Sequence, residues 1–244
     1  MHANNEIGNI VDIKKIAALC KANNALYHSD TVKTMAHMEF DFSDTLVDFA
    51  SCSAHRFHGP KGVGFAFIRK ATGLKGIITG GPQERSLRAG TENVAGIVGL
   101  GKALELCINN MEAYAAHIRE IKAYAIEKLS AEVSNIKFNG RSGEMENSVD
   151  SVLSVLLPYK NPLIGLQLDM KGIAISQGSA CSSGASKPSM VMMMVLSEDE
   201  MDHCTPLRIS FSHLTTKSDI DALANALKEI SSDYTIEKTN VEHR

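Results

Sequence analysis

Two polar stretches of this chain contain residue types that can do chemistry. The first lies between Val47 and Ile68, where small residues, two histidines and a Gly-Pro-Lys-Gly turn at residues 59–62 separate two apolar, strand-like runs. Glycine is free in φ, whereas proline fixes φ and lacks an N–H, so regular structure is expected to break here. Polar loops between apolar strands commonly bind ligands in α/β proteins, although an ordinary hairpin turn explains the same residues.

The second stretch runs from Ser176 to Pro188 and contains almost no bulky side chains. Glycine and serine at this density predict a mobile surface loop. Cysteine is usually buried, so Cys181 in the middle of this loop is unusual and is expected to be exposed. An exposed thiol can act as a nucleophile or a sulfur carrier, and an incidental surface cysteine is the alternative.

Two shorter features complete the set of candidate ligand-binding residues. Asp30 follows a short apolar run, residues 25–28, that is expected to form a buried strand. A carboxylate at the carboxyl end of such a strand is well placed for a ligand, and a cap for the next segment is the alternative. The glycine-bounded loop 80–91 contains Arg85 and Arg88, which could hold a phosphate or a carboxylate or lie in a solvated loop.

The elements that must position these residues alternate between helix and strand. Asp12 is expected to cap a helix that ends at Asn23, and helical periodicity extends over residues 92–132 with a domain boundary near 112. Beyond that boundary the pattern predicts strands at 136–138, 151–157, 173–176 and 207–211, a short helix at 162–170, a capping box from Ser197 to Glu200, and a last helix that begins near Thr216.

The composition limits the class of protein and the kinds of partner. The chain has 244 residues, of which 44% are apolar and 22% charged, and its net charge is −3. These values are typical of a soluble globular protein and indicate neither a nucleic-acid nor a membrane partner. We expect no signal peptide and no membrane span. The five cysteines lack a metal-type spacing such as C-x-x-C, which indicates a reduced, cytoplasmic location.

A metal site is a further hypothesis for the histidine-containing region. The candidate ligands are His28, His37, Cys52, His55 and His58. Their spacing fits no standard zinc pattern, so no metal site is predicted.

With these residues in view, the chain resembles the cysteine desulfurases, the NifS-like members of the class V aminotransferases. The resemblance covers nearly the whole chain. It is carried by the motifs M-H-x-N-N-E-I-G at residues 1–8, Y-H-x-D at 27–30, S-x-H-x-x-x-G-P-K-G at 53–62, R-x-G-T at 88–91, G-S-A-C at 178–181 and R-x-S-F at 208–211.

The resemblance implies an α/β protein of PLP-dependent transferase fold type I. Residues 1–112 would be the C-terminal part of its large mixed-sheet domain, and residues 113–244 a smaller α+β domain carrying the cysteine loop. It also implies a homodimer that binds pyridoxal 5'-phosphate (PLP) and takes sulfur from L-cysteine, leaving L-alanine. The sulfur would be held as a persulfide and passed to an acceptor or scaffold protein for iron–sulfur cluster or thio-cofactor synthesis.

The same resemblance implies roles for the cofactor-binding residues. Asp30 would pair with the pyridine nitrogen and keep it protonated, which makes the ring an electron sink. Asn5 would hydrogen-bond the ring hydroxyl oxygen and lie beside the substrate. Ser53 and His55 would hold the phosphate, with His55 also in the catalytic centre, and Thr91 would reach the phosphate of the partner subunit.

Two further residues would act on the substrate. Arg208 would clamp the substrate carboxylate with a two-pronged pair. Cys181 would attack the substrate sulfur as a thiolate and carry the persulfide, and a mobile loop suits this role because the sulfur must reach an acceptor.

The chain departs from the family at the position of the catalytic lysine, which is Arg56 here. That lysine forms the Schiff base with PLP, and an amine must be neutral to attack an aldehyde. An arginine side chain, with a pKa near 13.8, is neutral in only roughly one molecule in ten million at pH 7. Arg56 is therefore not expected to form the covalent link, and the nearby Lys61 belongs to the Gly-Pro-Lys-Gly turn.

Two other departures concern Lys33 and the start of the chain. Lys33 stands where the family usually has a glutamine, three residues after the aspartate; its ammonium could still donate to the ring oxygen or compete as a Schiff-base donor. Family members begin well before Met1, so we expect a preceding segment of roughly two-fifths of a full-length member, which would carry a phosphate-binding helix start.

Three hypotheses for function follow. The first is a cysteine desulfurase, or the larger part of one. The second is a truncated, catalytically impaired desulfurase-like protein or dimer partner, because Arg56 replaces the Schiff-base lysine. The third is a persulfide carrier that uses only Cys181.

Overall fold

The computed structural model describes residues 1–177 and 189–242. It consists of two compact units: the first contains residues 1–3 and 11–113, and the second contains residues 4–10 together with the chain from Tyr114 on. Residues 4–10, which were expected in the domain 1–112, therefore belong to the second unit. The reason is hydrogen bonding, because the N–H of Val149 donates to Gly8 O at 2.9 Å and the N–H of Ile10 donates to Asn147 O at 3.1 Å.

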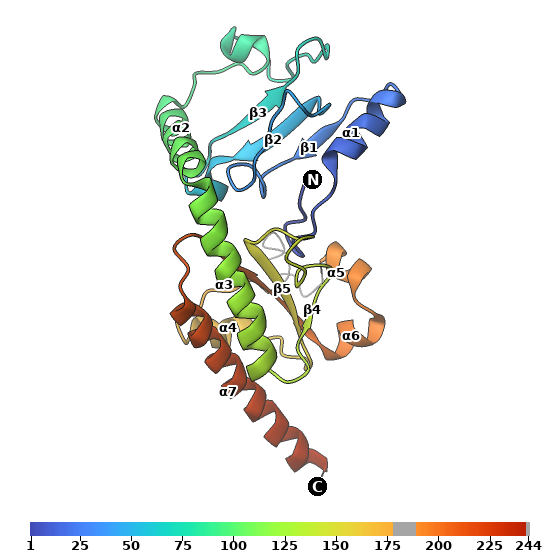
Figure 1. Ribbon diagram of the computed structural model, residues 1–244, viewed down its shortest axis with the longest axis vertical. Coiled ribbons are helices and arrows are strands. Elements are labelled where there is room, and N and C mark those ends of the chain that lie inside the picture. Colours follow the sequence, from blue (N-terminus) through green and yellow to red (C-terminus); the bar gives the residue numbers. More distant parts are fainter. Residues whose placement is uncertain (178–188, 243–244) are drawn as a thin grey trace. The chain divides into compact units, whose positions relative to one another are not determined.

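The first unit contains a three-stranded sheet in the order β1-β2-β3 (Figure 1). Strand β1 (His28–Asp30) is parallel to β2 (Phe49–Ser53), and β2 is antiparallel to β3 (Gly64–Ile68). The strand predicted at 25–28 is displaced toward Asp30. The N–H of Tyr27 donates to the Asp48 carboxylate at 2.9 Å instead of joining a strand ladder, so regular pairing starts only at His28.

Helices and a small core complete the first unit. Helix α1 (Ile13–Ala22) begins at the predicted cap, where the Asp12 carboxylate accepts from Lys15 N. It packs Ile13 and Ala17 against residues of the sheet region. The 3-10 turns η1 (Ala54–Phe57) and η2 (Gln83–Ser86) precede α2 (Val94–Asn109). The predicted helical region 92–132 is two helices separated at Asn110.

The second unit is built on an antiparallel sheet of β4 (Lys137–Phe138), β5 (Val152–Leu157) and β6 (Thr205–Ser210). Strand β5 is buried along its whole length, which explains why all of its residues except Ser154 are apolar. The strand predicted at 173–176 is wrong. The N–H of Ile173 closes the preceding helix on Leu168 O at 2.9 Å, and only Ser176 forms a bridge, with Arg208.

Long and short helices cover this sheet. Helices α3 (Met111–Glu132) and α7 (Lys217–Glu242) lie side by side (Figure 1) and are linked by a hydrogen bond of 2.6 Å from the Tyr124 hydroxyl to Asp221. The core between helices and sheet is aliphatic and includes Leu129, Leu153 and Leu227, all fully buried. The remaining helices are α4 (Ile164–Asp169), α5 (Met190–Val195) and α6 (Glu198–His203).

The capping box at the start of α6 is confirmed, since Ser197 and Glu200 exchange both of its hydrogen bonds. Among the described residues, no helix combines the length and apolar character that a bilayer crossing requires.

Candidate functional site

In the first unit, Asp30 and Ser53 lie at the same edge of the sheet. Each is the last residue of its strand, and the two strands are neighbouring and parallel. The chain beyond Asp30 stays close to β2, because both the N–H and the hydroxyl of Thr31 donate to Ser51 O at 2.9 Å. A polar, partly open edge at the carboxyl ends of parallel strands is the usual ligand position in α/β proteins.

The Asp30 side chain is held in place by its neighbours. Its Oδ1 accepts from Val32 N at 2.9 Å, and its backbone carbonyl accepts from His2 N at 2.8 Å. The His2 ring in turn contacts the Thr34 hydroxyl at 2.9 Å. Burial lowers the pKa of His2, so this ring is neutral at pH 7 and supports the loop as a hydrogen-bonding group. Lys33 lies half-buried in the same turn.

His55 and Arg56 extend this edge from the turn η1. Phe57 is fully buried and anchors the turn, whereas His55 and Arg56 are exposed. The His37 ring contacts Arg56 O at 3.0 Å and ties η1 to the loop that follows β1. The edge therefore presents one carboxylate, one hydroxyl, an imidazole and a guanidinium, which suits an anionic ligand that also has a basic nitrogen.

The hairpin that carries this edge depends on Gly64. A Cβ at this position would lie 2.2 Å from Cys52 O, which is closer than any real contact. Cys52 itself is buried, and burial raises the pKa of its thiol to about 11, with the Asp30 charge adding to the shift. The Cys52 thiol therefore stays protonated at pH 7 and is not a candidate nucleophile.

The loop 80–91 uses one of its two arginines for contacts within the loop. Arg88 forms a bridge with Ile78, and its Nη1 donates to Ala89 O at 2.7 Å, so its guanidinium is partly used in the loop itself. Thr91 is exposed just before α2. The proposed contact of Thr91 with a partner subunit stays a prediction.

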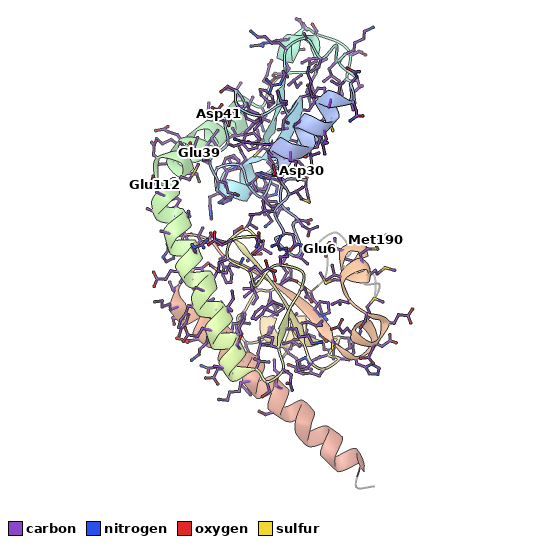
Figure 2. All side chains as sticks on the ribbon, turned by 45° about the vertical axis from the view of Figure 1, so that its right-hand side comes forward. Glu6, Asp30, Glu39, Asp41, Glu112 and Met190 are labelled. Atoms are coloured by element: carbon purple, nitrogen blue, oxygen red, sulfur yellow. The ribbon has the colours of Figure 1, made fainter. Side chains whose placement is uncertain are left out.

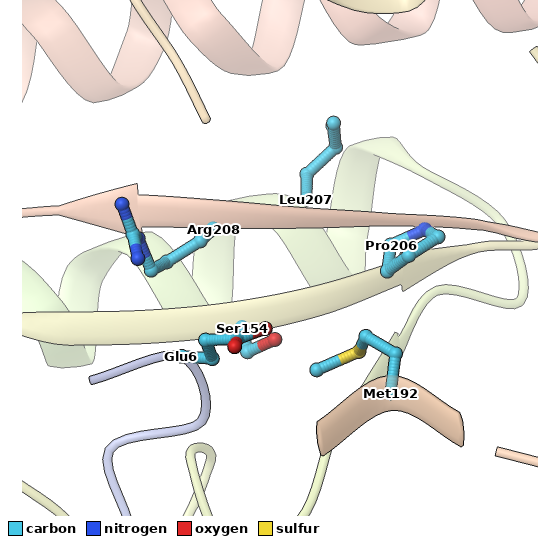
Figure 3. A pocket seen from close by; sticks show the side chains of 6 residues that line it. All are labelled: Glu6, Ser154, Met192, Pro206, Leu207 and Arg208. Carbon is cyan, nitrogen blue, oxygen red and sulfur yellow. The ribbon is translucent and has the colours of Figure 1, made fainter. Parts of the chain in front are cut away.

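Arg208 and Asn5 come together in the second unit. Arg208 is half-buried on β6; its Nη1 donates to Asn5 O and its Nη2 to the Ser176 hydroxyl, both at 3.1 Å. A small pocket adjoins this arginine (Figure 3), and its lining is Glu6, Ser154, Met192, Pro206, Leu207 and Arg208. Glu6 falls within the first motif, but nothing in the sequence distinguishes it from its neighbours as a functional residue.

The third group of predicted residues lies outside the described part of the chain. Cys181 and the G-S-A-C motif fall within residues 178–188, so the exposure and mobility of that loop stay predictions. Within the described residues, no group of three or more histidine, cysteine or carboxylate side chains could hold a metal ion.

The family model described as aminotransferase class-V matches residues 1–223. The chain belongs to the class-V aminotransferases. Members of this family depend on pyridoxal phosphate, which is an anion with a ring nitrogen and fits the groups at the Asp30 edge.

Relatives within the family are cysteine desulfurases. The chain is 38% identical over 231 residues to cysteine desulfurase IscS of Dictyoglomus turgidum and 39% identical over 230 residues to that of Clostridium botulinum strain Hall. Each comparison covers 94% of this chain and 58% of the relative. The chain thus spans less than two thirds of the length of these curated relatives.

Solved structures support the same fold. A NifS-like protein superposes with a TM-score of 0.81 at 32% identity, and the NifS-like protein of Rickettsia africae does so with 0.81 at 28% identity. Both comparisons cover 95% of this chain and 60% of the other. The fold is therefore the mixed α/β architecture of PLP-dependent fold type I, as the resemblance implied.

Proposed function

We propose that this protein is a cysteine desulfurase that removes sulfur from L-cysteine, leaves L-alanine and holds the sulfur as a persulfide on Cys181. The observation that carries the proposal is the edge at which Asp30 and Ser53 end parallel strands, next to His55 and Arg56. The names of the relatives at 38 and 39% identity support the substrate class.

The residues at this edge fit the charged groups of pyridoxal phosphate. We propose that the Asp30 carboxylate pairs with the ring nitrogen, that Ser53 and His55 bind the phosphate, and that Lys33 donates to the ring oxygen in place of the family's glutamine. When bound, the cofactor supplies an electron sink for bond breaking at the substrate's α and β carbons. Asp30 maintains that property because a carboxylate beside the ring nitrogen favours its protonated form.

Arg56 does not fit the covalent link to the cofactor. A guanidinium is protonated at any physiological pH, so it cannot attack an aldehyde. Arg56 is also exposed, and a cation at this point adds attraction for the phosphate. We therefore propose that pyridoxal phosphate is held here by charge pairs and hydrogen bonds alone, which makes turnover slow.

The second unit supplies the substrate-binding residues in this proposal. Arg208 offers a forked guanidinium for the carboxylate of L-cysteine, and Asn5 is placed by its own carbonyl contact with that arginine. Cys181 would receive the sulfur: its thiolate would attack the substrate sulfur and form the S–S bond as the substrate's C–S bond breaks. The electron pair of the broken bond would stay with the β carbon, which takes up a proton to give L-alanine, and pyridoxal phosphate would supply the electron sink for this bond breaking.

A persulfide carrier without turnover is the second candidate function, and Arg56 favours it. In that case Cys181 would accept sulfur from another persulfide. Under either function we propose a homodimer, with Thr91 reaching the partner's site, a cytoplasmic location, and a sulfur-acceptor or scaffold protein as partner. The four cysteines in the described part of the chain are free thiols, which supports a reducing compartment.

One experiment separates the two functions. The purified protein is incubated with pyridoxal phosphate and L-cysteine, alanine and sulfide are measured, and persulfide on each cysteine is located by mass spectrometry. A desulfurase yields alanine in step with persulfide on Cys181, and Cys181→Ser abolishes the persulfide while the control Cys20→Ser does not. Persulfide on Cys181 only after addition of a persulfide donor, without alanine, would support the carrier instead.

A further inference from the structure

Glu6 is a buried carboxylate that the proposed function does not use. Glu6 is only 8% exposed to solvent. The turn around it is set by the Asn4 side chain, whose Oδ1 accepts from the N–H groups of Glu6 at 2.9 Å and Ile7 at 3.0 Å. Glutamate is rarely buried unless it is paired, because loss of water around a charge is costly. A buried glutamate such as Glu6 is therefore expected to have a hydrogen-bonding partner.

The partner is Ser189, at the start of α5. The Ser189 hydroxyl donates to Glu6 Oε2 at 2.5 Å and accepts from Met192 N at 3.1 Å, so it caps the helix at the same time. A serine hydroxyl has a single hydrogen to donate. When Ser189 donates it to Glu6, a lone pair of the same oxygen points toward the N–H of Met192 and accepts from it. Glu6 and Met190, the first residue of α5, lie close together in Figure 2.

The other end of this arrangement is Arg208. The carbonyl that accepts from Arg208 Nη1 belongs to Asn5, the residue directly before Glu6. Glu6 and Met192 of α5 line the same pocket as Arg208 (Figure 3). A shift of Glu6 would therefore move the Asn5 carbonyl that orients the guanidinium.

We propose that Glu6 is a positioning residue that, through Ser189, fixes the start of α5 and the guanidinium of Arg208 in one arrangement. The identity of the ligand at Arg208, the carboxylate of L-cysteine, rests on the proposed function. The coupling of Glu6, Ser189 and Arg208 does not, and it can be measured without turnover.

Two measurements that need no activity test the coupling. Amide hydrogen exchange of α5 reports on the cap, and the rate at which phenylglyoxal modifies Arg208, read by mass spectrometry, reports on the guanidinium. We expect Ser189→Ala and Glu6→Ala to speed exchange in α5 roughly fivefold to thirtyfold. The double variant should exchange no faster than either single variant, because both break the same link.

Conservative variants separate positioning from mere stability. Ser189→Thr keeps a donor and a good cap and should stay within about twofold of wild type in both measurements. Glu6→Gln keeps the size and an acceptor oxygen but removes the charge, and should raise the modification rate of Arg208 severalfold. Glu127→Gln, an exposed carboxylate on α3, is the matched control and should change neither measurement.

Kinetics add a third measurement where turnover is present. Glu6→Gln should raise the KM for L-cysteine about tenfold and change kcat by less than about twofold, since it acts on the arginine that binds the carboxylate. Unchanged modification of Arg208 in both Glu6 variants, or independent effects in the double variant, overturns the positioning role. Absence of turnover in wild type, with the coupling intact, overturns the desulfurase and leaves the positioning role established.

Discussion

Replacement of Arg56 by lysine should give this chain a covalent attachment point for pyridoxal phosphate. The supporting geometry is already present, since Arg56 is exposed on the turn η1, which follows Ser53, and its backbone carbonyl contacts the His37 ring. The substitution should therefore change the free energy of unfolding by no more than about 0.5 kcal/mol.

The chemical gain follows from the fraction of neutral side chain. An ordinary lysine is neutral in roughly four molecules in ten thousand at pH 7, against roughly one in ten million for an arginine. The reactive amine at position 56 thus increases by more than three orders of magnitude. We expect Arg56→Lys to acquire an imine absorbance band that hydroxylamine removes.

The assay that decides this is reduction with borohydride followed by peptide mass spectrometry. Arg56→Lys should carry a phosphopyridoxyl group on the residue 56 peptide, and wild type should not. Arg85→Lys, which adds a lysine at an exposed position of η2, is the matched control and should remain unlabelled there. Stoichiometric labelling of wild type at Lys33 or Lys61, or no labelling of Arg56→Lys, would refute the reasoning.

Three further predictions concern the Asp30 edge and the stability of the fold. Asp30→Asn should weaken binding of pyridoxal phosphate roughly tenfold to a hundredfold in equilibrium dialysis, because a charge pair is lost; equal affinity would contradict the assigned pairing. Gly64→Ala should lower the free energy of unfolding by at least about 1 kcal/mol in urea, because its Cβ would meet Cys52 O, whereas Gly101→Ala in open space on α2 should be neutral or stabilising. Burial lowers the pKa of Lys122 from 10.5 to about 8, so the unfolded chain binds more protons between these values and the free energy of unfolding should rise across that window by about 3 kcal/mol in total. Denaturation from pH 7 to 10.5 should show this rise as the difference in the free energy of unfolding between wild type and Lys122→Met, because the other titrating groups, such as the Cys52 thiol, contribute equally to both.

Local sequence patterns predicted most elements correctly, for physical reasons that act over a few residues. The cap at Asp12 and the box at Ser197 and Glu200 satisfy backbone groups within one turn, so spacing alone reveals them. The strand predicted at 173–176 does not form, because the N–H of Ile173 donates to Leu168 O of the preceding helix. Residues 25–27 are not part of β1, because the N–H of Tyr27 donates to the Asp48 carboxylate.

The family motifs identified the candidate site residues but not the residues that hold them in place through hydrogen bonds. His37 and His2 stabilise the edge around Asp30 through contacts with residues 19 and 32 positions away, and no sequence periodicity predicts such pairs. Ser189 and Glu6 are 183 positions apart, and only the fold reveals that one caps a helix while bonding the other.

The sequence by itself determined the family and the chemistry of each candidate side chain. It also determined that position 56 cannot supply a neutral amine for a Schiff base, because the residue there is an arginine. Only the tertiary structure decided that residues 4–10 belong to the unit of Arg208 and that Asp30 and Ser53 share one sheet edge. The physical reason is that hydrogen bonds between distant segments, not local propensity, choose which backbone groups pair.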